Sequence, residues 1–133
     1  MTFKLSQKSL DKLNGVHEDL KAVVEKAITI SKIDFRVLEG LRSVDRQKEL
    51  VAQGKSLTMM SRHLTGHAVD LGAIDPKTGE LSWEGSLYDQ IANAMMEAAA
   101  KLNIPLRWGG TFKGLVDKVH FELPKTFEKY KGE

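Results

Sequence analysis

The sequence predicts an α+β fold in which a small, mainly antiparallel sheet is flanked by helices. Two helical patterns come first along the chain, and short strand patterns separated by loops follow, with one long helix among them. This order of segments is typical of α+β proteins. The length of 133 residues fits a single domain, residues 1–133, that can bury a hydrophobic core without covalent staples.

The first two predicted helices cover residues 6–13 and 17–31. Ser6 is a candidate N-cap for the first helix, and Asn14-Gly15 ends it. The second helix is predicted by apolar residues that recur at close to helical spacing: Leu20, Val23, Val24, Ala27, Ile28 and Ile30.

A strand and a third helix are predicted next. The segment IDFRVLEGLR, residues 33–42, favours a strand because its apolar and polar residues alternate. Ser43 can cap a helix over residues 44–53, which Gly54 ends. Within this helix we expect Gln47 to lie at the surface.

The second half of the chain supplies the remaining elements. Residues 86–103 carry the strongest helical pattern, an apolar stripe formed by Leu87, Ile91, Met95, Ala98 and Leu102. Alternation and turn composition predict strands over 68–73, 106–108 and 119–123, a turn over 75–80, and loops over 55–62 and from Gly109 onward. The last seven residues, FEKYKGE, are expected to form a frayed helix or a tail.

Charge and composition argue against several classes of protein. The net charge of +2 with neutral histidines is too weak for a nucleic-acid surface, so we expect no nucleic-acid partner. The absence of cysteine removes thiolate metal sites, disulfides and cysteine nucleophiles. No apolar run is long enough for a membrane span, and the N-terminal MTFKLSQKSLDKL lacks the apolar region of a signal peptide. We therefore expect the protein to start in the cytoplasm with no exit route of its own.

The stretch SRHLTGHAVD, from Ser61 to Asp70, places two histidines and an aspartate around a glycine. It is either a polar loop that runs into a half-buried strand or part of a metal site. Without sulfur, a catalytic zinc takes three histidine or carboxylate ligands and keeps its fourth position for water. A turn at Gly66 can bring His63 and Asp70 together, and His120 on an adjacent strand can supply the third ligand.

A carboxylate precedes the last of these histidines in the segment Asp117-Lys118-Val119-His120. Three residues before a ligand, Asp117 can reach a metal-bound water, act as general base and return the proton to a leaving amine. Zinc would lower the pKa of that water to about 7. Spacing alone leaves the alternative open that these histidines are ordinary surface or hydrogen-bonded residues.

The two motifs resemble those of a known peptidase family. SRHLTGHAVD followed by DKVHFEL is similar to the zinc D-Ala-D-Ala carboxypeptidases and L-alanyl-D-glutamate endopeptidases, which share their fold with the hedgehog signalling domain. The fixed positions of the first motif are matched by Ser61, His63, Gly66, Ala68 and Asp70. The resemblance covers about residues 10–123 and includes Arg42 and Gln47.

The resemblance implies that His63, Asp70 and His120 hold zinc and that Asp117 is the catalytic base. Many relatives have Glu at the base position, whereas the phage members that this chain resembles use the shorter Asp. In the strand interpretation His67 lies on the face opposite Asp70, so we expect it to point away from the metal.

Two further roles are implied by the same resemblance. Arg42 would polarise the scissile carbonyl and stabilise the developing oxyanion. Ser61 would hydrogen-bond near the site or to the substrate. The simpler alternatives are that Arg42 only pairs with Asp45 or Glu39 and that Ser61 is an ordinary loop hydroxyl.

The activity that the resemblance implies is that of a zinc peptidase acting on the peptide stems of bacterial peptidoglycan, with L-Ala–D-Glu as the favoured bond. The short chain, the missing signal peptide and Asp117 resemble a phage endolysin. Such a protein accumulates in the host cytoplasm and reaches the cell wall when another protein opens the membrane. We expect a monomer without a separate wall-binding domain.

Two alternatives remain at this point. One is a D-Ala-D-Ala carboxypeptidase or dipeptidase of the same family. The other is a zinc-binding module that recognises the wall without catalysis, although the presence of Asp117 and Arg42 speaks against it.

Overall fold

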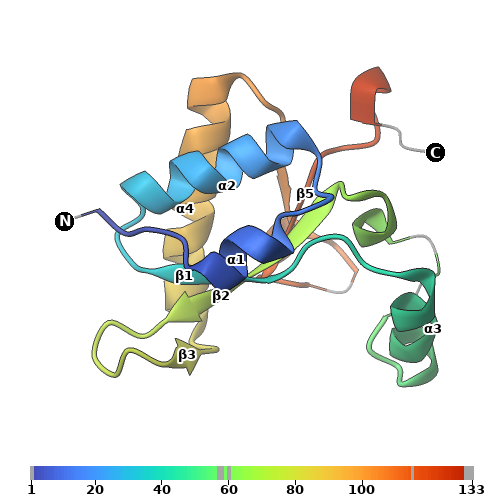
Figure 1. Cartoon of the computed structure of the whole chain (residues 1–133), viewed down its shortest axis with the longest axis horizontal. Coiled ribbons are helices and arrows are strands. Elements are labelled where there is room, and N and C mark those ends of the chain that lie inside the picture. The colour runs from blue at the N-terminus through green and yellow to red at the C-terminus, as the bar shows by residue number, and fades with distance from the viewer. Residues whose placement is uncertain (1, 57–58, 60, 115, 131–133) are drawn as a thin grey trace.

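The computed structural model of the protein describes residues 2–56, 59, 61–114 and 116–130. The helices are α1 (Gln7–Lys12), α2 (Glu18–Ile30), α3 (Val44–Ala52) and α4 (Gly85–Leu102). The strands are β1 (Phe35–Glu39), β2 (Ala68–Ile74), β3 (Leu81–Ser82), β4 (Arg107–Trp108) and β5 (His120–Glu122). Short 3-10 helices are η1 (Arg62–Thr65), η2 (Gly109–Thr111) and η3 (Glu128–Tyr130). Figure 1 shows α2 and α4 crossing, with α3 set apart from them.

The strands form one antiparallel sheet in the order β1-β2-β5-β4. β2 is the longest strand and pairs with β1 on one side. On its other side, the first residues of β2 pair with β5 and its last residues pair with β3. Ala73, for example, pairs with Phe35 of β1 on one side and with Ser82 of β3 on the other. β2 is therefore the central strand around which the other elements are placed.

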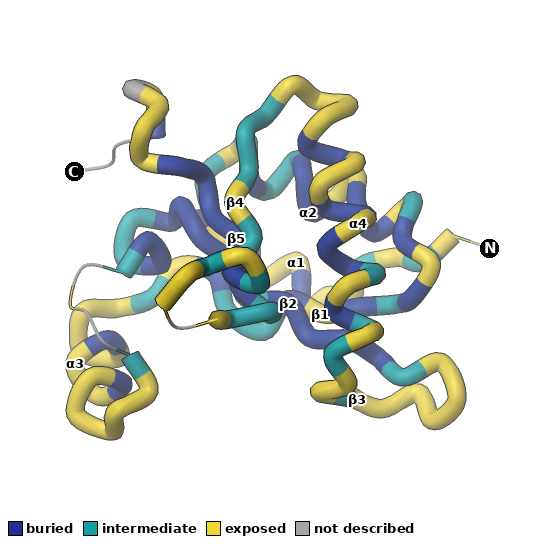
Figure 2. The backbone as a smooth tube through the Cα atoms, turned by 180° about the vertical axis from the view of Figure 1, so that it is seen from behind, coloured by how far each residue is buried: buried dark blue, intermediate teal, exposed yellow. Residues whose placement is uncertain are grey.

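One face of this sheet packs against the helices. Val69 and Leu71 of β2 and Phe121 of β5 alternate with polar residues and are fully buried in the same core cluster as residues of α2 and α4. The helical pair thus covers the apolar face. In Figure 2, β2 is mostly buried, while α3 and the turn between β2 and β3 are mostly exposed.

The α+β class predicted from the sequence is confirmed, with differences at several elements. β1 ends at Glu39, so Gly40 lies beyond the strand that was expected to include it. β3 was not predicted, because two residues are too few to show alternation. The segment before β2 holds the 3-10 helix η1, where only a loop and a turn were expected.

The C-terminal expectation of a frayed helix or a tail is confirmed only as to the helix, the 3-10 helix η3, because the described part of this segment is held to the core. Tyr130 is buried, and its hydroxyl donates a hydrogen bond of 2.6 Å to Asp19 Oδ2 at the start of α2. The backbone up to Tyr130 is therefore fastened to the core instead of fraying; residues 131–133 lie outside the described residues. Among the helices that the structure describes, none is long and apolar enough to cross a membrane.

Candidate active site

The strand register places polar side chains together on the face of the sheet opposite the helices. Asp70 of β2 lies directly opposite His120 of β5, and Val69 lies opposite Phe121. Directly paired residues of antiparallel strands point to the same side of the sheet. Since Val69 and Phe121 face the core, Asp70 and His120 face away from it, next to each other.

A tight turn brings His63 to the same place. Ser61 caps η1, its Oγ accepting a hydrogen bond of 3.2 Å from the His63 backbone N–H. Gly66 ends η1 with a φ of +75°, and a Cβ there would lie 2.2 Å from the carbonyl oxygen of Gly15. Only glycine fits both demands, so Gly66 fixes how the motif turns from η1 into β2.

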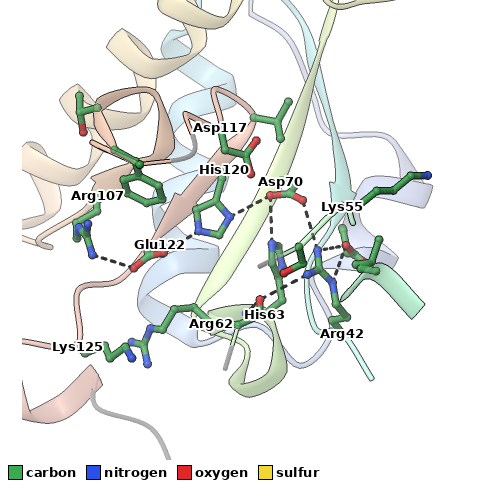
Figure 3. Close-up of a pocket in the computed structure, with 18 of the residues that line it drawn as sticks. Arg42, Lys55, Arg62, His63, Asp70, Arg107, Asp117, His120, Glu122 and Lys125 are labelled. Carbon is green, nitrogen blue, oxygen red and sulfur yellow. Dashed lines mark hydrogen bonds and ion pairs between the residues drawn. The ribbon is translucent and has the colours of Figure 1, made fainter. Parts of the chain in front are cut away.

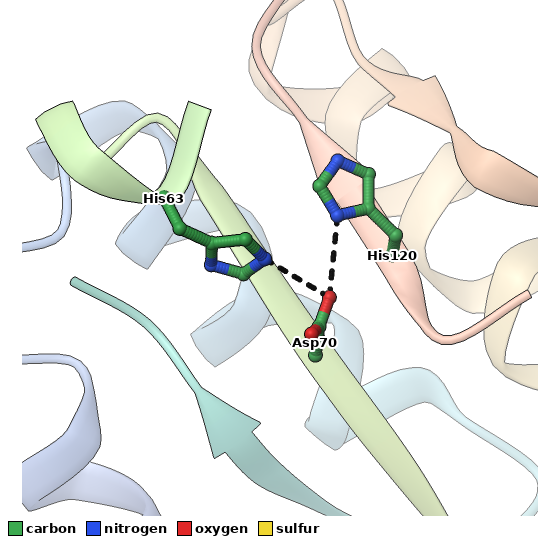
Figure 4. Close-up of side chains that lie close together, drawn as sticks. All are labelled: His63, Asp70 and His120. Carbon is green, nitrogen blue, oxygen red and sulfur yellow. Dashed lines mark hydrogen bonds and ion pairs between the residues drawn. The ribbon is translucent and has the colours of Figure 1, made fainter. Parts of the chain in front are cut away.

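His63, Asp70 and His120 form a compact group of ligand atoms. His63 Nε2 lies 3.1 Å from Asp70 Oδ1, and His120 Nδ1 lies 3.2 Å from the same oxygen. One ligand atom from each residue lies within 4.8 Å of the other two. Figure 4 shows the three side chains pointing toward one another. Tetrahedral zinc with bonds of 2.0–2.2 Å separates its ligand atoms by about 3.3–3.5 Å. The group therefore has the chemistry and the spacing of a metal site without sulfur.

The outer nitrogens of both histidines are held by acceptors. His63 Nδ1 lies 2.8 Å from the carbonyl oxygen of Gly40, and His120 Nε2 lies 2.7 Å from Glu122 Oε1. A carbonyl or carboxylate oxygen only accepts, so each of these nitrogens carries the hydrogen. The opposite nitrogens, Nε2 of His63 and Nδ1 of His120, are thereby presented to the metal position.

Glu122 is a functional residue that the sequence reasoning missed. It lies two residues after His120 on β5, and residues two apart on a strand share a face. That spacing was the available signal, since a buried carboxylate on the ligand face serves to orient the histidine.

The charges in this group are strongly coupled. Burial by itself raises the pKa of Asp70, but hydrogen bonds from His120 and His63 outweigh it and hold that pKa well below its usual range. Burial by itself lowers the pKa of His120, but Asp70 and Glu122 reverse this and raise it to about 9. Without a metal ion, therefore, the His120 ring is protonated on both nitrogens and positively charged at neutral pH.

Arg42 lies beside the ligand group and is fixed from three sides. Its Nε donates a hydrogen bond of 2.9 Å to Glu39 Oε1, and its Nη1 donates to Gln47 Oε1 at 2.8 Å and to Ser61 Oγ at 3.5 Å. One terminal nitrogen lies 3.7 Å from Asp70 Oδ2. The guanidinium pairs with Glu39, as the simpler alternative held, and it also reaches the edge of the ligand group.

Gln47 corrects the expectation that this side chain lies on the helix surface. It is fully buried, and its amide nitrogen donates a hydrogen bond of 2.9 Å to Ser56 Oγ while its oxygen accepts from Arg42. The periodicity of α3 could not show this, because the partners Arg42 and Ser56 lie outside the helix. Gln47 thus positions Arg42.

Asp117 lies on the other side of the ligand group, next to His120 and Asp70 in Figure 3. Its backbone N–H donates a hydrogen bond of 2.9 Å to the Gly109 carbonyl, and a Cβ on Gly109 would lie 2.1 Å from the Asp117 carbonyl oxygen. This close approach requires glycine. Burial, and then the negative charge of Asp70, raise the pKa of the Asp117 carboxyl above its usual value.

All six candidate residues line a single cavity of about 950 Å³: Arg42, Ser61, His63, Asp70, Asp117 and His120. The cavity holds a trio able to bind a metal, a carboxylate with a raised pKa and a fixed guanidinium. These are the parts needed for hydrolysis of an amide by a metal-activated water.

His67 lies outside the ligand group, although it belongs to the same motif. Its Nδ1 is 2.7 Å from Thr65 Oγ1, and its ring packs on that of His17 with centroids 5.3 Å apart. His17 in turn caps α2, its Nδ1 accepting a hydrogen bond from the Asp19 N–H. These two histidines therefore stabilise the turn and the start of α2.

Comparisons with known proteins agree on one family. The family model described as phage L-alanyl-D-glutamate peptidase matches residues 1–127. The L-alanyl-D-glutamate peptidase of Escherichia phage T5 is 28% identical over 129 residues, which cover 94% of this chain and 92% of that protein. The enzyme of the same name from Listeria phage A118 is 30% identical, and the match spans 99% of this chain but 44% of that longer protein.

A solved structure has the same fold. The crystal structure of the Serratia marcescens L-Ala D-Glu endopeptidase ChiX superimposes with a TM-score of 0.87 at 45% sequence identity. The superposition covers 93% of this chain and 92% of that one. The similarity therefore extends over nearly the whole fold.

Proposed function

Because the chain belongs to the phage L-alanyl-D-glutamate peptidase family, we propose that it cuts the L-Ala–D-Glu bond of peptidoglycan stem peptides by zinc-dependent hydrolysis. The named relatives from phages T5 and A118 and the Serratia endopeptidase make the chain a peptidase. The observation that carries the finer proposal is the ligand group of His63, Asp70 and His120, with Asp117 and Arg42 in the same cavity.

The donor set fits zinc well. His63 would bind through Nε2, His120 through Nδ1 and Asp70 through Oδ1, because these atoms converge and the outer histidine nitrogens are already engaged. Two imidazoles and one carboxylate suit zinc and similar divalent ions. When bound, zinc supplies a Lewis acid for the carbonyl and brings the pKa of the attacking water to about 7.

Asp117 and Arg42 act from opposite sides of the ligand group. Asp117 takes a proton from the attacking water and later returns it to the leaving amine of D-Glu. Its raised pKa suits this exchange, because a more basic carboxylate accepts the proton more readily. The Arg42 guanidinium, fixed by Glu39 and Gln47, stabilises the negative charge that develops on the carbonyl oxygen.

Ser61 has two roles in this proposal. Its hydroxyl caps the turn that carries His63, and its position in the cavity wall lets it hydrogen-bond to the bound peptide. The first role concerns the fold and the second concerns the substrate, so a Ser61→Ala variant would affect both.

The proposal extends to where the protein works. Residues 1–133 act as one catalytic domain and as a monomer on peptidoglycan; the match to the phage T5 relative, which covers 94% of this chain and 92% of that protein, is consistent with the single domain. The protein accumulates in the cytoplasm of the host bacterium and reaches the wall after a separate protein has permeabilised the membrane.

Mass spectrometry of digested peptidoglycan tests this function. Purified walls are incubated with the zinc-loaded protein, with and without a chelator, and the fragments are identified. Chelator-sensitive release of peptides with a new N-terminal D-Glu supports the proposal. Loss of terminal D-Ala instead would indicate the carboxypeptidase alternative, and intact walls from several bacteria would indicate a non-catalytic wall-recognition module.

A further inference from the structure

Among the arginines that line the cavity, Arg107 lies on the side away from Arg42. Arg107 begins β4 and lies opposite Glu122 of β5, on the same face of the sheet as the ligand group. Figure 3 shows Arg107 and Arg42 at opposite ends, with His120, Asp70 and His63 between them. A peptide that lies across the ligand group therefore has a guanidinium within the cavity on each side of it.

Arg107 is held in place but still accessible. Its guanidinium carbon lies 4.8 Å from the centre of the Phe112 ring, and its side chain is 54% exposed. In the part of the chain that the structure describes, its one hydrogen bond goes to Glu122 Oε2 at 3.4 Å. The other oxygen of Glu122 makes a much shorter contact, 2.7 Å, with His120. The guanidinium therefore keeps N–H groups for a ligand in the cavity.

The two substrate residues beside the scissile bond differ in the groups that they offer to a guanidinium. L-Ala presents a methyl group and, on its amino side, a neutral amide. D-Glu is joined to the next residue of a peptidoglycan stem through its side-chain carboxyl, so its α-carboxyl remains as a free carboxylate or as an amide. A planar guanidinium pairs best with a carboxylate, through two parallel hydrogen bonds.

We propose that Arg107 binds the free α-carboxylate of D-Glu on the leaving side of the scissile bond. This inference rests on the proposed function and adds the group that recognises the acidic residue. Lys113 and Lys125 also line the cavity, but a flexible ammonium lacks the fixed fork that Phe112 gives to Arg107.

Two substrates that differ in one group test the proposal. N-acyl-L-Ala-D-Glu-L-Lys peptides, joined through the D-Glu side chain, are prepared with the α-carboxyl free or amidated. We expect the zinc-loaded protein to prefer the free carboxylate on the order of tenfold to a hundredfold in kcat/KM, as a charge-assisted hydrogen bond gives. Arg107→Gln should cut both peptides at similar rates.

Arg46→Gln is the matched control. Arg46 also lines the cavity, is 46% exposed and pairs with a glutamate, Glu49, at 3.2 Å, but it belongs to α3 on the Arg42 side. This variant should keep the preference for the free carboxylate. A second measurement is calorimetric binding of the product D-Glu-L-Lys to the metal-free protein, which needs no catalysis. The affinity for this product should be lower in Arg107→Gln than in the unsubstituted protein.

The outcomes separate this inference from the proposed function. Equal cleavage of both peptides by the unsubstituted protein, or an undiminished preference in Arg107→Gln, would overturn the role of Arg107 and leave the peptidase function intact. A loss of preference in Arg46→Gln as large as in Arg107→Gln would also overturn it, because the effect would then be one of general charge. Failure to cut either peptide would contradict the proposed function itself.

Discussion

The two faces of strands β2 and β5 are made from alternate residues of the same segments, yet they contribute differently to the protein. Val69, Leu71 and Phe121 are fully buried against the helices. Asp70 and His120 project from the same strands into the cavity. Each buried apolar side chain stabilises the fold by about 1.5–3 kcal/mol, whereas buried charges gain little unless they are paired. The difference teaches that one face is built for stability and the other for binding.

The largest expected effect is on the polar side of this comparison. Asp117→Ala should lower kcat/KM for wall peptides by roughly 10²–10⁴, because the variant lacks the carboxylate that we propose as general base. Bound zinc and the midpoint of thermal unfolding should stay close to those of the unsubstituted protein, since Asp117 is not one of the three ligands. The rate of peptide release and the zinc content are measured on the same preparation. Unchanged hydrolysis would remove Asp117 as the base.

A substitution on the apolar face should have the opposite signature. Leu71 follows Asp70 in the sequence, but its side chain is buried in the core. Leu71→Ala leaves a cavity there and should lower the free energy of unfolding by about 2–5 kcal/mol. Denaturant unfolding measures this cost. Under conditions where the variant remains folded, its zinc content should equal that of the unsubstituted protein. A folded Leu71→Ala protein without zinc would show that the two faces are not separate.

We expect the pH dependence of metal binding to come from His120. Its pKa is raised from 6.5 to about 9, so its proton stabilises the metal-free fold fully below about pH 6.5, and this contribution is lost as the pH rises through 9. Metal binding must displace that proton. Below pH 9 the apparent zinc affinity should therefore fall by about tenfold for each unit by which the pH is lowered, in addition to any effect of buffer.

Calorimetry in buffers of different ionisation enthalpy checks this expectation. About one proton should be released per zinc bound near pH 7. Zinc binding without proton release would mean that His120 is already neutral in the metal-free protein, and the charge coupling described for the polar face would then be wrong.

A smaller effect is expected for the carboxylate that orients His120. Glu122→Gln keeps the shape but removes the charge, and it should weaken zinc binding about 10–100-fold, as is typical for partners of ligand histidines. Glu49→Gln, an exposed residue on α3, is the matched control and should leave zinc affinity unchanged. Competition with a chromophoric chelator measures both affinities, and equal values for the two variants would argue against the orienting role.

The apolar face could be predicted from the sequence, because periodicity reports which residues share a side. The alternation in residues 68–73 and the apolar stripe of residues 86–103 predict β2 and α4 to within a residue or two. β3 escaped prediction because its two residues show no alternation. The burial of Tyr130 escaped because it depends on Asp19, more than a hundred positions away.

The polar face could be predicted only in part. The resemblance of the two motifs to those of zinc peptidases indicated His63, Asp70 and His120, which spacing alone left open, and the structure brings all three together. Glu122 and Gln47 were missed, since their value depends on which partners the fold places beside them. A charge or an amide in a sequence does not reveal whether it faces solvent or orients a neighbouring side chain.

Zinc stoichiometry tests the central claim, that the polar face of β2 and β5 holds a catalytic metal, most directly. Zinc per chain is measured by elemental analysis for the unsubstituted protein and for His63→Ala, Asp70→Ala and His120→Ala, each checked for folding by circular dichroism. His67→Gln is the control, because His67 lies in the same motif but outside the ligand group. We expect one zinc in the unsubstituted protein and the control, and a loss in each folded ligand variant. Full zinc retention in folded His63→Ala or His120→Ala would contradict the account.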